Sequence, residues 1–289
     1  MKTVIVISGP TASGKSSLAM ELAQKLSGVI VSADSMQIYR GMDIGTAKPA
    51  KEDMRRVEHR LIDVLDIGEP FSVADYKREA CAAIDEIISA GRQPFLVGGT
   101  GLYIDAVMNN VSFGDFECPP GIREELSSEA EKLGAEHMYG MLKEVDPEAA
   151  EGIHPNNMKR VIRALEVYRA TGKTITYYKS ISKTDPPKYN FLHYTLVPKS
   201  REELYARINA RVDKMMEDGL EREARELFDS GLERAVTACQ AIGYKELFGA
   251  FRGDMTVDEA VELLKQRTRN YAKRQLTWFS RYDAVRLYV

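Results

Sequence analysis

The sequence predicts a parallel β-sheet flanked by helices and interrupted by one helical insertion. Short runs rich in β-branched residues, at 3–8, 28–33, 94–97 and 191–197, alternate with helical stretches. This alternation is typical of parallel sheets, whose strands are joined by helical crossovers. Between about residues 114 and 190 no such run occurs, and the segment is charged and helical. We therefore expect a core formed by residues 1–113 and 191–289 and an all-helical insertion over 114–190, with a linker at 114–121.

The first predicted strand runs directly into a glycine-rich segment that matches the pattern G-x-x-x-x-G-K-[ST]. The segment consists of Gly9, Pro10, Thr11, Ala12, Ser13, Gly14, Lys15 and Ser16. In this pattern backbone N–H groups surround a phosphate, the lysine adds positive charge, and the Ser16 hydroxyl is a ligand for Mg²⁺. A chance glycine-rich turn is the alternative, but strand, loop and helix all agree with the motif. The sequence thus predicts an α/β fold of the P-loop NTPase type that binds a di- or triphosphate, with Mg²⁺ as cofactor.

Polar residues also follow the next two predicted core strands. Asp34 comes directly after the strand at 28–33, and Gly98-Gly99-Thr100 follows the strand at 94–97. Because ligands gather beyond the carboxyl ends of parallel strands, we expect Asp34 and Thr100 to lie close to the phosphate loop. A tight turn without function remains the alternative for the glycine pair. Residues 60–65 are further expected to form a short strand, and 76–90 a helix.

Basic residues are concentrated in two regions, although the net charge is −3. Residues 159–179 hold six basic groups against one acidic group, and residues 265–281 hold six against none. A helix predicted from Asn157 to Thr171 has a stripe formed by Met158, Val161, Ile162, Leu165 and Tyr168, with its cations off that stripe. A solvated face is the usual meaning of such a pattern, and a phosphate backbone partner is the alternative.

Composition excludes several classes of protein. No apolar run approaches the length of a membrane span, and the first residues form a core strand rather than a signal peptide. The three cysteines form no C-x-x-C pair, so neither a zinc cluster nor a disulfide framework is indicated. We expect a cytoplasmic monomer without a membrane partner.

The chain resembles the bacterial tRNA dimethylallyltransferases, also called tRNA isopentenyltransferases, in more than its phosphate loop. The segments that carry the resemblance occur in the family's order; they are residues 9–16, 34–49, 98–104, 163–166 and 240–244. The resemblance implies transfer of a dimethylallyl group from dimethylallyl diphosphate to the exocyclic N6 of adenosine at tRNA position 37, next to the anticodon, with release of diphosphate. It implies that the phosphate loop holds the leaving diphosphate and that the target base is flipped into the protein.

The resemblance also assigns roles to individual residues. Asp34 is the implied general base, while Thr100 and Arg211 are implied to stabilise the leaving group together with Lys15 and Mg²⁺ on Ser16. Arg211 is chosen over Arg207 because it stands four residues before Met215, as in the family. The residues implied to contact the tRNA anticodon stem-loop are Asp34, Ser35, Met36, Gln37, Thr100, Lys159, Arg160, Val161, Ile162, Arg163, Gln240, Gly243, Tyr244 and Lys245.

From the residues alone, two other interpretations stay open. A small-molecule P-loop kinase that uses ATP shares the loop, the aspartate after the second strand and the size of the core. It would need an arginine-bearing lid over the γ-phosphate and has little use for two basic helices. A nucleotide-gated RNA-binding switch without catalysis would leave Asp34 and the turn at 98–101 without a purpose.

Overall fold

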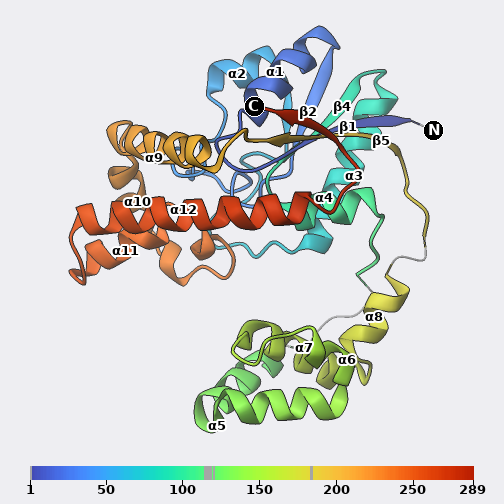
Figure 1. Cartoon of the computed structure of the whole chain (residues 1–289), viewed down its shortest axis with the longest axis vertical. Coiled ribbons are helices and arrows are strands. Elements are labelled where there is room, and N and C mark those ends of the chain that lie inside the picture. The colour runs from blue at the N-terminus through green and yellow to red at the C-terminus, as the bar shows by residue number, and fades with distance from the viewer. Residues whose placement is uncertain (1, 114–118, 120, 183–184) are drawn as a thin grey trace. The chain divides into compact units, whose positions relative to one another are not determined.

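The computed structural model describes residues 2–113, 119, 121–182 and 185–289 (Figure 1). The chain divides into two compact units, the first formed by Met1–Met108 with Pro187–Val289 and the second by Asn109–Pro186. The insertion predicted over 114–190 covers most of the second unit, with ends displaced by a few residues. The linker predicted at 114–121 falls mostly outside the described residues.

The first unit is built on a six-stranded sheet with the order β3-β2-β4-β1-β5-β6, and every neighbouring pair is parallel. The strands are β1 (Thr3–Ser8), β2 (Gly28–Ser32), β3 (His59–Arg60), β4 (Gln93–Gly98), β5 (Asn190–Val197) and β6 (Val285–Tyr288). From β1 the chain moves outward to β2, returns to β4 between them, and later crosses to β5 on the other side of β1. This reversal creates a crevice beyond the carboxyl ends of the central strands, where ligands of such sheets bind. The predicted parallel α/β fold is confirmed.

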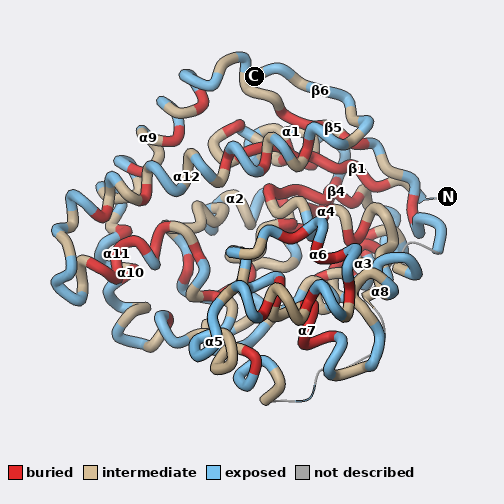
Figure 2. Tube along the Cα trace, turned by 60° about the horizontal axis from the view of Figure 1, so that its bottom comes forward, coloured by how far each residue is buried: buried red, intermediate tan, exposed pale blue. Residues whose placement is uncertain are grey.

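Successive residues of the central strands point to opposite faces of the sheet, so one strand supplies two cores. Val4 and Val6 of β1 belong to a core shared with α3 and α4, whereas Ile5 and Ile7 belong to a core shared with α1. Figure 2 shows that β1 and β4 are buried along most of their length. The helices of this half are α1 (Lys15–Lys25), α2 (Lys51–Arg56), α3 (Val73–Ser89) and α4 (Gly101–Met108). Burial on both faces explains why these strands are continuously apolar.

A third core fixes the segment that follows Asp34. Ile38, Tyr39 and Met42 are buried among residues of the C-terminal helices. These helices are α9 (Arg201–Glu217), α10 (Leu220–Asp229), α11 (Lys245–Arg252) and α12 (Val257–Phe279), with the short 3₁₀ turns η1 (Leu232–Arg234) and η2 (Ala238–Gln240). The polar stretch after β2 is therefore held on a helical layer contributed by the far end of the chain.

Two predicted elements differ from the structure. The strand expected at 60–65 ends at Arg60, because Leu61 and Asp63 take positive φ angles of 62° and 54° that interrupt extended backbone. The chain then turns so that the N–H groups of Val64 and Leu65 both donate to the carbonyl of Ile38. The helix expected from residue 76 already begins at Val73, because Ser72 and Asp75 form a capping box.

The second unit is helical, with α5 (Ile122–Val145), α6 (Pro147–Glu151), α7 (Met158–Thr171) and α8 (Ile175–Ile181). Val161 and Leu165 of α7 are buried in its core, as their spacing predicts. Tyr168 was expected on the same stripe but is 37% exposed. In the described part of the chain, no helix is both long and apolar enough to cross a membrane.

A buried histidine under the start of the phosphate loop makes folding stability depend on pH. His193 of β5 is 8% exposed, its Nε2 lies 2.8 Å from the Ser8 Oγ, and burial lowers its pKa to about 4. In the unfolded chain the imidazole has a pKa of about 6.5, so below that pH the unfolded state binds more protons. Stability is therefore fully present above about pH 6.5 and is lost as pH falls toward 4.

We expect the His193→Gln variant to lose this dependence. Urea unfolding at pH 7.5 and pH 5 should show that the wild type loses about 2 kcal/mol more than the variant over this interval. Carboxylates titrate alike in the two proteins, so their contribution to the change in unfolding free energy cancels when the variant is subtracted from the wild type. Equal losses in the two proteins would show that His193 is not held neutral in the folded state.

Candidate active site

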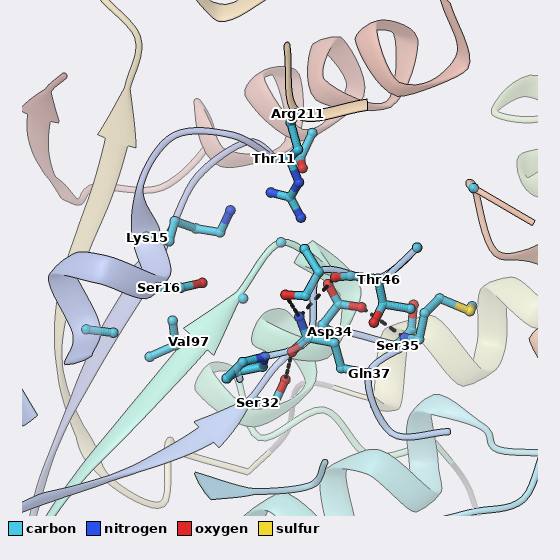
Figure 3. A pocket seen from close by; sticks show the side chains of 18 of the residues that line it. Thr11, Lys15, Ser16, Ser32, Asp34, Ser35, Gln37, Thr46, Val97 and Arg211 are labelled. Carbon is cyan, nitrogen blue, oxygen red and sulfur yellow. Dashed lines mark hydrogen bonds between the residues drawn. The ribbon is translucent and has the colours of Figure 1, made fainter. Parts of the chain in front are cut away.

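A cavity of about 610 Å³ opens beyond the carboxyl ends of β1, β2 and β4 in the first unit (Figure 3). Its walls come from the phosphate loop, the segments at 34–37 and 45–47, the turn at 98–99, the segment at 240–243, and helices α9 and α12. Segments from both ends of the chain therefore line one cavity. It lies beyond the carboxyl ends of the central strands, where the strand order predicts a ligand site.

The phosphate loop has the backbone conformation that its glycines permit. Gly9 has a φ of 142°, and a Cβ added there would lie 2.7 Å from the carbonyl oxygen of Leu196. Gly14 caps α1 with a φ of 85°, and Ala12 takes a φ of 60°, which is unusual for a residue with a side chain. The Lys15 Nζ donates to the Pro10 carbonyl at 2.7 Å. The loop thus curls around its own lysine at the start of α1.

The charges around the cavity act on one another. Burial, together with the positive charge of Arg211, lowers the pKa of Lys15 to about 8 against the opposing effect of the negative charge of Asp34. Burial also lowers the pKa of Arg211, again with Asp34 in opposition. Figure 3 shows the Arg211 guanidinium directed into the space between Lys15 and Asp34. The two cations outnumber the one carboxylate, so the cavity has excess positive charge there. This charge favours the binding of a multiply charged anion.

Asp34 is held on one side and open on the other. Its Oδ1 accepts the N–H of Met36 at 2.9 Å, and within the described residues its Oδ2 has no hydrogen-bond partner. The turn after β4 is tied to both neighbours of Asp34: the N–H of Thr100 donates to the Ala33 carbonyl, and the N–H of Ser35 donates to the Thr100 Oγ1. A fixed carboxylate with a free oxygen is suited to accept a proton from a bound ligand.

The loop at 44–47, which forms another wall, is braced from two sides. The Gln37 Nε2 donates to the carbonyls of Thr46 and Ala47 at 3.2 and 3.3 Å. The Glu223 carboxylate accepts the N–H groups of Ile44 and Gly45, and the Tyr244 hydroxyl donates to it at 2.6 Å. Glu223 therefore joins this loop to the segment that ends at Tyr244.

The Ser16 hydroxyl is a group at the cavity that could hold Mg²⁺. Within the described residues no group of three or more His, Cys, Asp or Glu side chains could hold a metal ion. The exposed Ser16 hydroxyl at the cavity is a hard oxygen ligand. Mg²⁺ typically takes one or two protein oxygens and completes its shell with substrate phosphates and water. Ser16 is thus a suitable single protein ligand beside a bound diphosphate.

A family model described as IPP transferase matches residues 37–282 of the chain. The chain belongs to this family. It is 50% identical to the tRNA dimethylallyltransferase of Acetivibrio thermocellus over 285 residues, which is 99% of this chain and 91% of that protein. It is 48% identical to the tRNA dimethylallyltransferase of Halalkalibacterium halodurans over 276 residues, which is 96% of this chain and 87% of that protein.

Solved structures agree with this assignment to the IPP transferases. The fold matches the tRNA isopentenylpyrophosphate transferase of Bacillus halodurans with a TM-score of 0.73 at 44% identity, covering 100% of this chain and 90% of that one. It matches a eukaryotic dimethylallyltransferase acting on tRNA with a TM-score of 0.84 at 29% identity, covering 100% of this chain and 74% of that one. These similarities support a transferase and give no support to the kinase interpretation.

The cavity of this IPP transferase brings together most of the residues that the sequence singles out in the first unit. The predicted residues that line it are Thr11, Lys15, Ser16, Asp34, Ser35, Met36, Gln37, Arg211, Gln240 and Gly243. Arg207, the rejected alternative to Arg211, is exposed and does not line it. The choice between the two arginines therefore agrees with where the structure places them.

Three predicted residues are placed differently. Thr100 does not line the cavity but lies behind Ser35, whose N–H its hydroxyl accepts, so it acts on the site through that residue. Tyr244 is fully buried against Gly45 and Glu223, and Lys245 is exposed and donates to the Gln240 carbonyl at 3.0 Å. A buried tyrosine ring cannot contact an RNA directly. Tyr244 instead supports the cavity wall.

The predicted RNA-binding residues of α7 lie in the second unit. Lys159 and Arg160 are exposed, whereas Val161 is completely buried and cannot contact RNA through its side chain. Arg163 donates to Glu166 at 2.8 Å, and Arg123 of α5 makes two hydrogen bonds to the same carboxylate. Glu166 thus fixes two guanidinium groups on one surface of this unit.

The contribution of α12 to the cavity was not predicted from the sequence. Leu264, Thr268, Tyr271 and Gln275 line the cavity at helical spacing. Burial and the charge of Asp34 raise the pKa of Tyr271 to about 12, which keeps its hydroxyl protonated. The spacing of these four residues in the sequence is the signal that could have predicted their place at the site.

The packing of Gly45 gives a prediction for the loop at 44–47. A Cβ at Gly45 would lie 2.5 Å from the Tyr244 ring, which has no room to move because it is fully buried. We expect Gly45→Ala to lower the free energy of unfolding by about 1–3 kcal/mol and to raise the KM for the nucleic-acid substrate, because the wall shifts. Thermal unfolding and steady-state kinetics measure both effects.

Gly68→Ala is the matched control, since a Cβ at Gly68 meets nothing within 4 Å. It should leave stability and KM close to the wild type. If the Gly45 and Gly68 variants behaved alike, the contact between Gly45 and Tyr244 would not hold the loop.

Proposed function

We propose that this chain transfers the dimethylallyl group of dimethylallyl diphosphate to the exocyclic N6 of adenosine at position 37 of tRNA, releasing diphosphate. The observation that carries the proposal is the placement of Lys15 and Arg211 opposite Asp34 in one cavity of a chain that belongs to the IPP transferase family. Cations suit the leaving diphosphate, and the carboxylate suits the attacking amine.

The donor side is formed by the phosphate loop. Backbone N–H groups of the loop and the N-terminus of α1 bind the diphosphate oxygens. Lys15 and Arg211 stabilise the negative charge that develops on these oxygens as the bond from C1 of the prenyl group to oxygen breaks. Both side chains line the cavity before the substrate binds, so the positive charge is in place when this negative charge develops.

Mg²⁺ held by the Ser16 hydroxyl, when bound, adds positive charge to the leaving diphosphate. The protein supplies a single hard oxygen ligand for this ion, and the donor's own phosphates supply more. We therefore expect the divalent ion to bind together with the donor.

The acceptor side is formed by residues 34–37 and 240–243. The new bond joins the adenine N6 to C1 of the prenyl group, and the N6 proton passes to the free Oδ2 of Asp34. An aromatic amine is a poor nucleophile, so this proton transfer assists the attack. A stacked anticodon loop hides this amine, which requires the base to be flipped into the cavity.

The second unit offers a surface for the anticodon stem-loop. Lys159, Arg160 and the pair of arginines on Glu166 provide cations for RNA phosphates. We further propose a monomer as the active form and, because the substrate is tRNA, a cytoplasmic location. Size-exclusion chromatography with light scattering tests the monomer.

The activity is tested with purified protein, Mg²⁺, dimethylallyl diphosphate and a tRNA transcript with adenosine at position 37. Nucleoside mass spectrometry should find prenylated adenosine mapped to that position. A transcript with guanosine at position 37 should remain unmodified. An unmodified adenosine-37 transcript, or equal modification of both transcripts, would contradict the proposed reaction.

A further inference from the structure

We propose that Gln275 is a positioning residue that sets the spacing between the phosphate loop and the acceptor side of the cavity; this inference rests on the proposed function. Its Oε1 accepts the Thr11 N–H at 2.8 Å, and its Nε2 donates to the Gly99 carbonyl at 2.9 Å. The side chain is 4% exposed. One buried amide therefore joins the loop after β1 to the turn after β4.

The two partners fix the orientation of this amide. A backbone N–H only donates and a backbone carbonyl only accepts, so the oxygen must face Thr11 and the nitrogen must face Gly99. The approach is possible because residue 99 is a glycine, since a Cβ there would lie 2.2 Å from the Gln275 Nε2. No other neutral side chain of this length offers an acceptor and a donor in this arrangement.

The bridge extends to the catalytic carboxylate. Gly99 precedes Thr100, whose N–H donates to the Ala33 carbonyl and whose hydroxyl accepts the Ser35 N–H. Residues 33 and 35 flank Asp34. Tyr271, one turn before Gln275 on α12, also interacts through its hydroxyl with Thr100 and Gln275. A displacement of Gln275 therefore changes the position of the phosphate loop relative to Asp34.

Prenyl transfer depends on that spacing. The reacting carbon must lie between the leaving oxygen and the attacking N6, and a misplacement of about 1 Å costs about 10²-fold in rate. Because the Thr11 N–H is bound to Gln275, the diphosphate is bound by the later groups of the loop. The geometry thus assigns Gln275 to the transfer step more than to the binding of diphosphate.

Two variants distinguish a positioning role of Gln275 in the transfer step from a role in fold stability alone. Gln275→Met removes both hydrogen bonds with little change of shape. Gln275→Glu keeps an acceptor for the Thr11 N–H, but its carboxylate faces the Gly99 carbonyl with a second acceptor. When protonated, that carboxyl regains a donor and resembles the amide. Gln93→Met is the control, because the Gln93 Nε2 bonds the Thr3 and Pro94 carbonyls at the opposite end of these strands.

The measurements are the single-turnover rate of transfer, the Kd for inorganic diphosphate and the thermal midpoint. We expect Gln275→Met to lower the rate about 10²-fold at every pH, with a much smaller change in the Kd for diphosphate. The rate of Gln275→Glu, relative to the wild type, should rise as pH falls and its carboxyl becomes protonated. Gln93→Met should leave the rate close to the wild type.

Rates for both Gln275 variants equal to the wild type would overturn the proposal. It would also be overturned if rate, diphosphate affinity and thermal midpoint fell in proportion, or if Gln275→Glu showed no recovery at low pH. If Gln275→Met fails to fold, the proposal is decided by whether the transfer rate of Gln275→Glu, relative to the wild type, rises as pH falls. A wild type that binds diphosphate but prenylates no tRNA would refute the proposed function instead.

Discussion

Asp34→Asn is expected to lower the single-turnover rate of prenyl transfer by about 10²–10⁴-fold while tRNA and diphosphate binding persist. Asparagine keeps an oxygen that accepts the Met36 N–H, so the turn after β2 stays in place. The amide cannot take the proton from N6, which leaves the attacking amine unassisted. Single-turnover mass spectrometry, with filter binding of the tRNA, separates the chemical step from binding.

Asp66→Asn is the matched control, because Asp66 is exposed and pairs with Arg40 away from the cavity lining. It should turn over like the wild type. If Asp34→Asn retained near-wild-type turnover with normal tRNA binding, Asp34 would not be the general base. A loss of tRNA binding in parallel with the rate would instead make Asp34 a binding residue.

Arg211→Met is expected to lower kcat/KM for the donor by about 10²–10³-fold, because it removes a cation from the leaving diphosphate. The variant should also change the alkaline limb of the pH profile. In the wild type, kcat/KM should fall above about pH 8 as Lys15 of the free enzyme loses its proton. Because the charge of Arg211 lowers the pKa of Lys15, its removal should shift this limb to higher pH.

Arg207→Met provides the control, since Arg207 lies one turn away on the same helix, is exposed and does not line the cavity. It should keep both the rate and the position of the alkaline limb. An Arg207 variant as impaired as the Arg211 variant would show that charge on α9 acts at long range, without a specific contact.

The parts of the fold that could be predicted are those whose cause is local in the sequence. The phosphate loop is determined by two glycines, a lysine and the elements on either side of it. The position of Asp34 followed from a rule about where parallel strands end. In contrast, the short strand expected at 60–65 failed because the backbone there bonds to Ile38 of another segment. Propensity does not include such tertiary contacts.

The same distinction applies to the site. Gln275 belongs to it only because α12 packs with one particular register against the loops after β1 and β4. A single sequence does not specify this register. Tyr244 was expected to bind RNA because it stands in a family segment, but its ring fills the space beside Gly45. The ring is therefore part of the cavity wall and not of the surface that contacts the substrate.

The role of the phosphate loop is tested by measuring both products of one reaction mixture that contains tRNA, dimethylallyl diphosphate, ATP and Mg²⁺. We expect one diphosphate to be released for each prenylated adenosine at position 37, with ATP unchanged. We also expect inorganic diphosphate to compete with the donor. Consumption of ATP with unmodified tRNA would contradict the claim that the phosphate loop holds the leaving group of a prenyl donor.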